Sequence, residues 1–219
     1  MCEMGSTASS VRNPANSIEL DGTVGMPAGA VGIVLFAHGS GSSRLSPRNA
    51  YVAGALREAG IATLLFDLLT EREAANRAKV FDVDLLARRL HDATVWVRCQ
   101  PSMQHLRIGY FGASTGAAAA LIAAAADPGV RAVVSRGGRP DMAAAVLAKV
   151  TAPTLLIVGG DDGPVIRMNE EAYARLRCEK ALRIIPGASH LFEEPGTLEQ
   201  VTRLAIDWFG HHLGGVECA

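Results

Sequence analysis

Six short apolar runs divide the chain, and each stops at a glycine, a proline or a polar residue. The runs cover residues 31–37, 61–66, 106–111, 130–134, 154–158 and 182–185. Segments that are apolar at nearly every position suit strands buried on both faces, as in parallel sheets. The runs therefore predict a parallel sheet that is covered on both sides.

Segments with helical patterning lie between these runs. We expect helices over residues 48–59, 84–98, 115–126, 169–177 and 197–212. Gly60 would close the first helix, and Thr197 with Gln200 forms a capping-box pattern at the start of the last. Repeated alternation of strand and helix predicts the α/β class, with a doubly wound, mostly parallel sheet flanked by helices. Residues 17–24 are candidates for an additional antiparallel edge strand or hairpin.

The length of 219 residues fits one domain. The polar residues 1–16 are predicted to be a flexible N-terminal segment, residues 17–213 a single α/β domain, and residues 214–219 a C-terminal tail. No internal repeat and no linker divides the chain.

The composition and charge exclude several classes of protein and of binding partner. The chain is 49% hydrophobic and 20% charged, which excludes a disordered protein. A net charge of −1 provides no general attraction for nucleic acid or an anionic membrane. The polar N-terminus carries no secretory signal, and no apolar run reaches the roughly 18 residues of a membrane span. We expect a cytoplasmic monomer or homodimer that acts on a small molecule.

Cysteine and histidine positions give no sign of a metal or cofactor. The cysteines at positions 2, 99, 178 and 218 form no C-x-x-C pair and are expected to be free thiols. Apart from the adjacent His211 and His212, no histidine stands at metal-ligand spacing from another histidine, a cysteine or a carboxylate. We therefore expect no catalytic metal and no cofactor.

Residues 112–116 read Gly-Ala-Ser-Thr-Gly and match G-x-S-x-G. A predicted strand leads in and an alanine-rich helix leads out, which is the setting of a nucleophile elbow. A serine on so sharp a turn projects its hydroxyl above the sheet, and only very small residues fit two positions before and after it. The alternative is a glycine-rich turn with an ordinary capping serine. Ser114 is the candidate nucleophile.

A serine hydroxyl needs a base that a third group orients. Asp162 follows the run ending at Val158, and His190 follows the run ending at Ile185. Both are therefore expected at the carboxyl edge of the sheet, in the chain order Ser, Asp, His. Asp161 is the alternative acid, but it suits a turn-capping role better.

An oxyanion hole requires two backbone N–H groups. Thr115, directly after the candidate nucleophile, is expected to supply one. The loop of residues 38–43 should supply the other, from Ser40 or, as second choice, Gly41. His38 would shape this loop without transferring protons. The alternative for the loop, a phosphate cradle, lacks the third glycine of G-x-G-x-x-G.

Substrate contacts are expected at the same edge. Arg136 and Arg139 follow a predicted strand, where a guanidinium group can hold a substrate carboxylate. The alternative is that one or both pair with Asp141 or a helix end. Gly41 and Phe192 are further candidates for substrate contact, Phe192 as part of an apolar wall.

Together these motifs resemble an α/β-hydrolase. His38-Gly39, the elbow, Asp162 and Ser189-His190 occur in that order over nearly the whole chain. The compact size without an inserted cap domain is similar to the dienelactone hydrolase family. The resemblance implies a Ser-His-Asp hydrolase on a largely eight-stranded sheet. Better-known members have a cysteine nucleophile where this chain has Ser114, which points towards a general serine esterase.

The expected function is hydrolysis of small carboxylic esters or lactones through an acyl-enzyme. So short a chain leaves little length for a lid, so the site should be shallow and open. Two alternatives remain. One is acyl or perhydrolytic transfer on the same triad, and the other is a binding protein that kept the fold and lost catalysis.

Overall fold

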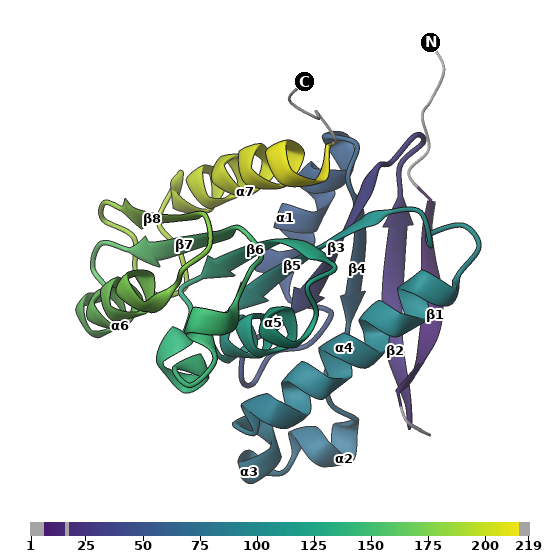
Figure 1. The fold of residues 1–219 in the computed structure, drawn as a ribbon, viewed down its shortest axis with the longest axis horizontal. Helices are drawn as coiled ribbons and strands as arrows, with labels where there is room; N and C mark the ends of the chain where they lie inside the picture. The colour runs from purple at the N-terminus through teal and green to yellow at the C-terminus, as the bar shows by residue number, and fades with distance from the viewer. Residues whose placement is uncertain (1–6, 16–17, 215–219) are drawn as a thin grey trace.

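One sheet of eight strands runs through the molecule in the order β1-β2-β4-β3-β5-β6-β7-β8 (Figure 1). The computed structural model describes residues 7–15 and 18–214, with side chains from residue 18 onwards. The strands are β1 (Thr7–Ala15), β2 (Ile18–Met26), β3 (Gly32–Ala37), β4 (Ala62–Phe66), β5 (Arg107–Ala113), β6 (Val130–Arg136), β7 (Thr154–Gly159) and β8 (Lys180–Ile185). Strands β3 to β8 are mutually parallel, and β1 and β2 join one edge as antiparallel strands.

Helices cover both faces of the sheet. They are α1 (Pro47–Glu58), α2 (Glu71–Ala74), α3 (Arg77–Val80), α4 (Val83–Cys99), α5 (Thr115–Ala126), α6 (Gly163–Arg175) and α7 (Thr197–Leu213), with short 3-10 turns at Pro140–Ala143 and Leu147–Lys149. Helices α1 and α7 pack on one face, and α4, α5 and α6 pack on the other (Figure 1). This confirms the predicted doubly wound, mostly parallel arrangement.

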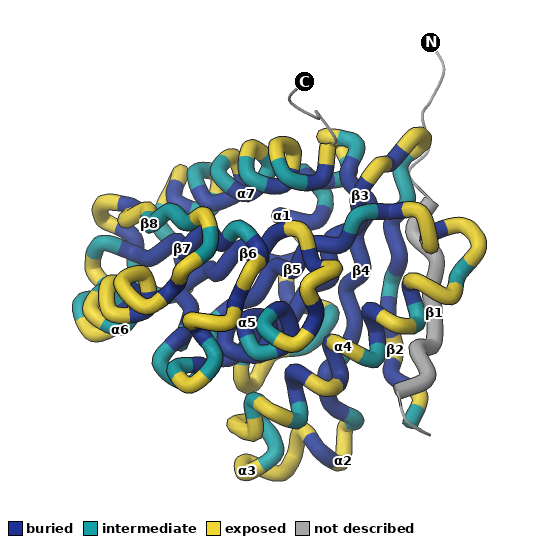
Figure 2. Tube along the Cα trace, in the orientation of Figure 1, coloured by how far each residue is buried: buried dark blue, intermediate teal, exposed yellow. Residues whose placement is uncertain are grey.

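Burial on both faces explains why the strands show no alternation in sequence. Along β3, Ile33 and Leu35 face the α4–α5 side, while Val34 and Phe36 face the α1–α7 side. All six residues of the strand are buried. Figure 2 shows the central strands buried and the outer sides of the helices exposed. The core is therefore two apolar layers separated by the sheet.

Helix α5 packs closely on the sheet because eight of its twelve residues are alanine. Nine of its twelve residues are buried, and small side chains let its axis come close to the sheet. At its first turn, a Cβ atom on Gly116 would overlap the carbonyl oxygens of Ala37 and His38. This close approach sets the helix start directly above β3, where the candidate site lies.

The N-terminal region differs from the expected flexible segment. Within residues 1–16, Thr7–Ala15 forms β1 and pairs with β2 over its whole length. Main-chain hydrogen bonds to a free sheet edge do not require apolar side chains, so a polar stretch joins the sheet without an apolar signal. The expected edge strand after residue 17 is β2. Residues 1–6, 16–17 and 215–219, including most of the predicted tail, lie outside the described residues.

Three further details differ from the expectations. Helix α6 begins at Gly163, six residues before the predicted start at residue 169. The predicted capping box at α7 is wrong, because Gly196 is the N-cap and the Thr197 hydroxyl donates to the Glu194 carbonyl at 2.7 Å. A capping box does occur at the unpredicted α2, between Thr70 and Glu73.

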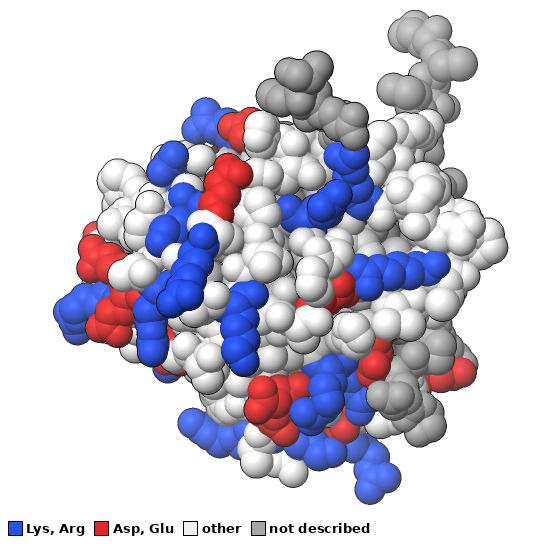
Figure 3. Space-filling model, in the orientation of Figure 1, with Lys and Arg blue, Asp and Glu red and all other residues white. Residues whose placement is uncertain are grey.

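The surface carries both signs of charge. Figure 3 shows basic and acidic side chains interspersed over the face in view. No helix in the described part of the chain combines the length and the apolar composition needed to cross a bilayer. Of the four cysteines, Cys99 and Cys178 are free thiols, and the other two lie outside the described residues.

Candidate active site

Ser114 occupies a strained turn between β5 and α5. Its φ of 51° and ψ of −120° lie in a region that residues with a side chain rarely adopt. A Cβ atom on Gly112 would overlap the backbone of Ala117. A Cβ atom on Gly39 would lie 3.1 Å from the Ser114 Cβ. The glycines of the motif are therefore what allows the chain to turn so sharply.

His190 and Asp162 form a short hydrogen bond. The His190 Nδ1 lies 2.6 Å from the Asp162 Oδ2, and the two side chains are 38% and 13% exposed. Asp162 is at the N-cap of α6, but its side chain caps no helical N–H. Asp161, the alternative acid, instead bonds through its backbone N–H to the Ala188 carbonyl. With Nδ1 bonded to the carboxylate, the Nε2 atom of His190 remains for proton transfer.

A turn after β6 joins the serine and the histidine. The Ser114 N–H donates to the Arg136 carbonyl and the Arg139 N–H donates to the Ser114 carbonyl, both at 3.1 Å. A Cβ atom on Gly137, whose φ is 52°, would lie 3.5 Å from Nδ1 and Cε1 of His190. Within the described residues, Ser114 and His190 share no side-chain hydrogen bond. Contacts of this kind often tighten only when substrate binds.

The two segments expected to form an oxyanion hole lie together. The Ser40 N–H donates to the Thr115 Oγ1 at 2.9 Å, although the two residues are far apart in sequence. In this state the Ser40 N–H is therefore occupied by the Thr115 hydroxyl. Binding an oxyanion there requires that hydroxyl to turn away.

His38 anchors the Ser40 loop. The Leu68 N–H donates to the His38 Nε2 at 3.0 Å, and the His38 Nδ1 lies 3.1 Å from the Gly39 carbonyl oxygen. The imidazole is therefore neutral with its proton on Nδ1. Burial lowers the pKa of His38, which keeps it neutral. These bonds agree with the expectation that His38 shapes the loop.

An ion pair that was not predicted from the sequence also anchors this loop. The Arg44 N–H donates to the Asp67 Oδ1 at 2.7 Å, and the Arg44 guanidinium also pairs with the Asp67 carboxylate. Because both residues follow strands of the parallel sheet, the pair ties the loop after β3 to the loop after β4. This ion pair could have been predicted from the sequence, because Arg44 and Asp67 carry opposite charge and follow neighbouring strands.

A cleft of about 870 Å³ opens beside the Ser40 loop. Its walls come from β2, from residues 38–47 and from residues 67–74, with Val80 and Leu86 behind them. Gly41 lines it, whereas Ser114 and His190 do not. The cleft adjoins the candidate nucleophile through Gly39 and Ser40, on the oxyanion-hole side.

The two candidate arginines have different surroundings. Arg139 is paired with both carboxylate oxygens of Asp141, at 2.9 and 2.8 Å. Arg136 is 8% exposed, and its Nη1 is buried with no hydrogen-bond partner among the described residues. Burial, with a contribution from nearby Arg48, lowers the pKa of Arg136 to about 10. The alternative partner Asp141 thus belongs to Arg139, and Arg136 keeps an uncompensated charge.

Phe192 lies deeper than expected. It is 2% exposed, has a φ of 55°, and belongs to the apolar layer between the sheet and α1 and α7. Its ring centroid lies 6.0 Å from the Arg136 guanidinium carbon. Phe192 therefore supports the His190 loop from below instead of forming an open apolar wall.

Two solved structures share the fold of this chain. A crystal structure of a dienelactone hydrolase from Anabaena variabilis is 57% identical, with a TM-score of 0.93 over 95% of this chain and 99% of that one. Est1E from Butyrivibrio proteoclasticus shares the fold, with a TM-score of 0.80 at 15% identity over 94% of this chain and 99% of that one.

Curated relatives come from two strains of Mycobacterium tuberculosis and carry the name "Putative phosphoribosyl transferase". They are 60% identical over 203 residues, which is 92% of this chain and 46% of theirs. The chain thus spans about half the length of these relatives. A sequence model of the dienelactone hydrolase family matches residues 21–213. The chain belongs to the dienelactone hydrolase family and has the α/β-hydrolase fold.

Proposed function

We propose that the chain is a serine hydrolase that cleaves small carboxylic esters or lactones through an acyl-enzyme. Membership of the dienelactone hydrolase family supports hydrolase activity. The observation that carries the finer proposal is the strained turn at Ser114, next to the His190–Asp162 pair at 2.6 Å. An activated serine requires a base that a third group orients, and strained backbone is common at such sites.

The proposed reaction has two steps. His190 takes the proton of Ser114 as the Oγ attacks the ester carbonyl, and the backbone N–H groups of Thr115 and Ser40 stabilise the oxyanion. His190 then protonates the leaving alcohol and activates water, which releases the acid. Asp162 holds the histidine tautomer and stabilises the imidazolium that forms in each step.

Two features bear on the substrate, one on its size and one on its charge. The cleft beside Ser40 has a volume of about 870 Å³, which suits a small molecule. The Arg136 guanidinium, buried and without a carboxylate partner in the described residues, supports esters that carry a carboxylate. Arg139 is the weaker candidate because Asp141 already occupies its guanidinium.

A comparison of esters tests the Arg136 contact. Arg136→Ala should raise KM for a carboxylate-bearing ester by about tenfold or more, and leave the KM of its neutral analogue nearly unchanged. Arg139→Ala is the matched control and should affect both esters little. An equal loss on the charged and neutral esters would reject the carboxylate role.

The nucleophile is tested by Ser114→Ala with p-nitrophenyl acetate and butyrate. Turnover should fall by about 10³–10⁶-fold, while circular dichroism shows the same folded protein. Unchanged turnover in a pure sample of the variant would contradict the proposal.

The alternative functions give different outcomes with the same reagents. Acyl or perhydrolytic transfer predicts slow hydrolysis but fast transfer to added alcohol or peroxide. A non-catalytic binding protein predicts no turnover of any ester. Phosphoribosyl transfer appears in the name of the Mycobacterium tuberculosis relatives. The match covers only 46% of their length, so that name describes a longer protein.

A further inference from the structure

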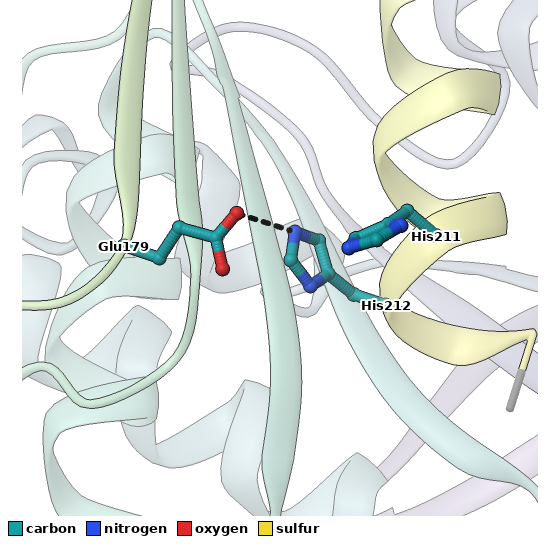
Figure 4. Close-up of side chains that lie close together, drawn as sticks. All are labelled: Glu179, His211 and His212. Carbon is teal, nitrogen blue, oxygen red and sulfur yellow. Dashed lines mark ion pairs between the residues drawn. The ribbon is translucent and has the colours of Figure 1, made fainter. Parts of the chain in front are cut away.

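Glu179, His211 and His212 lie close together near the start of β8 (Figure 4). This end of the parallel strands is opposite the carboxyl end of β5, which Ser114 follows. Glu179 immediately precedes β8, and the histidines belong to the last turn of α7. One ligand atom from each residue lies within 4.8 Å of the others. Glu179 is 32 residues from His211 in the sequence (211 − 179), so spacing alone did not reveal the group.

The separations suit a shared metal better than a direct bond. The His212 Nε2 lies 3.6 Å from the Glu179 Oε1, which is too long for a hydrogen bond. Two ligands bound tetrahedrally at about 2.0–2.2 Å from one zinc ion lie roughly 3.4 Å apart. The His212–Glu179 gap therefore already has nearly the width that an ion needs. The exposed His211 side chain can approach by rotating about its own bonds.

His212 is held in place with an unsatisfied nitrogen. Its side chain is 9% exposed, and its Nε2 is buried with no hydrogen-bond partner among the described residues. The Trp208 ring packs against the imidazole with centroids 4.6 Å apart, which fixes the orientation of the ring. A buried polar nitrogen without a partner is rare in native proteins, and a bound ion or water is a common explanation for one.

Local electrostatics favour a cation at this position. The carbonyl end of α7 carries the negative end of the helix dipole, and Glu179 adds a full negative charge. Two imidazoles and one carboxylate form a donor set that suits zinc.

We propose that Glu179, His211 and His212 bind one Zn²⁺ ion, with water completing a tetrahedral shell. The ion would join the end of α7 to the start of β8. These two elements flank the His190 loop, and within the described residues β8 is an edge strand that pairs with β7 alone. Because the site lies at the sheet edge away from Ser114, the role is structural and independent of the proposed hydrolase activity.

Zinc titration of the full chain without a histidine tag tests the site. Competition with a chromophoric chelator and calorimetry should both give one zinc ion per chain. His211→Asn and Glu179→Gln should each weaken zinc binding by about tenfold or more. His211 and Glu179 are exposed, so both variants should fold normally. His105→Asn, which alters an exposed histidine outside the group, is the matched control and should bind zinc like the original chain.

Two further readouts separate this site from other zinc binding. Zinc should raise the melting temperature of the original chain but not that of His211→Asn. Cu²⁺ should quench tryptophan fluorescence through Trp208, and Glu179→Gln should reduce the quenching at low Cu²⁺ concentration. No zinc binding at millimolar concentration, or equal affinity in all variants, would overturn the proposal. Binding lost on thiol alkylation but kept in His211→Asn would assign the zinc to a cysteine and would also overturn it.

Discussion

A histidine lies beside a carboxylate near each end of β8. The distance between the histidine nitrogen and the carboxylate oxygen differs by 1 Å between the two pairs. At the carboxyl end of β8, the His190 Nδ1 lies 2.6 Å from the Asp162 Oδ2. At the other end, the His212 Nε2 lies 3.6 Å from the Glu179 Oε1. The first distance is a charge-assisted hydrogen bond and the second is not. A histidine and a carboxylate are therefore arranged differently at the two ends.

The surroundings of the pairs explain the difference. His190 is 38% exposed and adjoins the strained turn of Ser114 across Gly137. His212 is 9% exposed, packs against Trp208 and lies at the carbonyl end of a helix. An accessible, oriented imidazole suits proton transfer. A buried imidazole with an unbonded nitrogen suits a fixed ligand.

Of the two histidine–carboxylate pairs, the shorter one is expected to have the larger effect on activity when it is broken. Asp162→Asn should lower kcat on p-nitrophenyl butyrate by about 10³–10⁴-fold, because the amide favours the wrong histidine tautomer. The matched change at the neighbouring residue, Asp161→Asn, should have little effect. Glu179→Gln, at the other pair, should leave kcat unchanged. Steady-state kinetics on the three variants measure this, and a similar loss in Asp161→Asn would count against Asp162.

A smaller effect is expected from the contact between the two proposed oxyanion donors. Thr115→Val removes the acceptor of the 2.9 Å bond from the Ser40 N–H, so the loop loses its anchor on α5. We expect kcat to fall by about tenfold, less than the full loss of an oxyanion-hole donor. Thr115→Ser keeps the hydroxyl and should retain activity. Faster turnover in Thr115→Val would mean that the hydroxyl blocks the Ser40 N–H instead of positioning it.

The smallest effect concerns His38, a buried histidine at the carboxyl edge of the sheet. Its folded-state pKa is lowered by burial, so below about pH 6.5 the unfolded chain binds more protons than the folded one. Stability should therefore fall as the pH drops through 6.5 towards the folded-state pKa of His38. Melting curves between pH 7.5 and 5 should show a shallower fall for His38→Gln. An equal slope in the two proteins would show that His38 does not titrate on unfolding.

The sequence predicted the parts of the molecule that depend on local pattern. All six apolar runs became strands, and α5 begins where the alanine run predicted, since neither depends on distant residues. The sharp turn at Ser114 was predicted from the glycine spacing together with the strand before it and the alanine-rich helix after it. Strand β1 was missed because an edge strand held by main-chain bonds needs no apolar residues.

What depended on packing could not be predicted. The Ser40–Thr115 bond and the approach of Glu179 to His212 join segments that are distant in sequence. Phe192 was expected on a wall of the site and lies in the core, at a positive φ that the sequence does not reveal. The sequence predicted the same substrate contact for Arg136 and Arg139. The structure shows that Arg139 is paired with Asp141, whereas the Arg136 Nη1 has no hydrogen-bond partner among the described residues.

Labelling with a fluorophosphonate probe tests the central claim most directly, because the probe reacts only with an activated serine. Intact mass and peptide mapping should show one adduct per chain, located on Ser114. The adduct should be absent from Ser114→Ala and strongly reduced in Asp162→Asn. No adduct on the folded chain, or an adduct on another serine such as Ser40, would contradict the account.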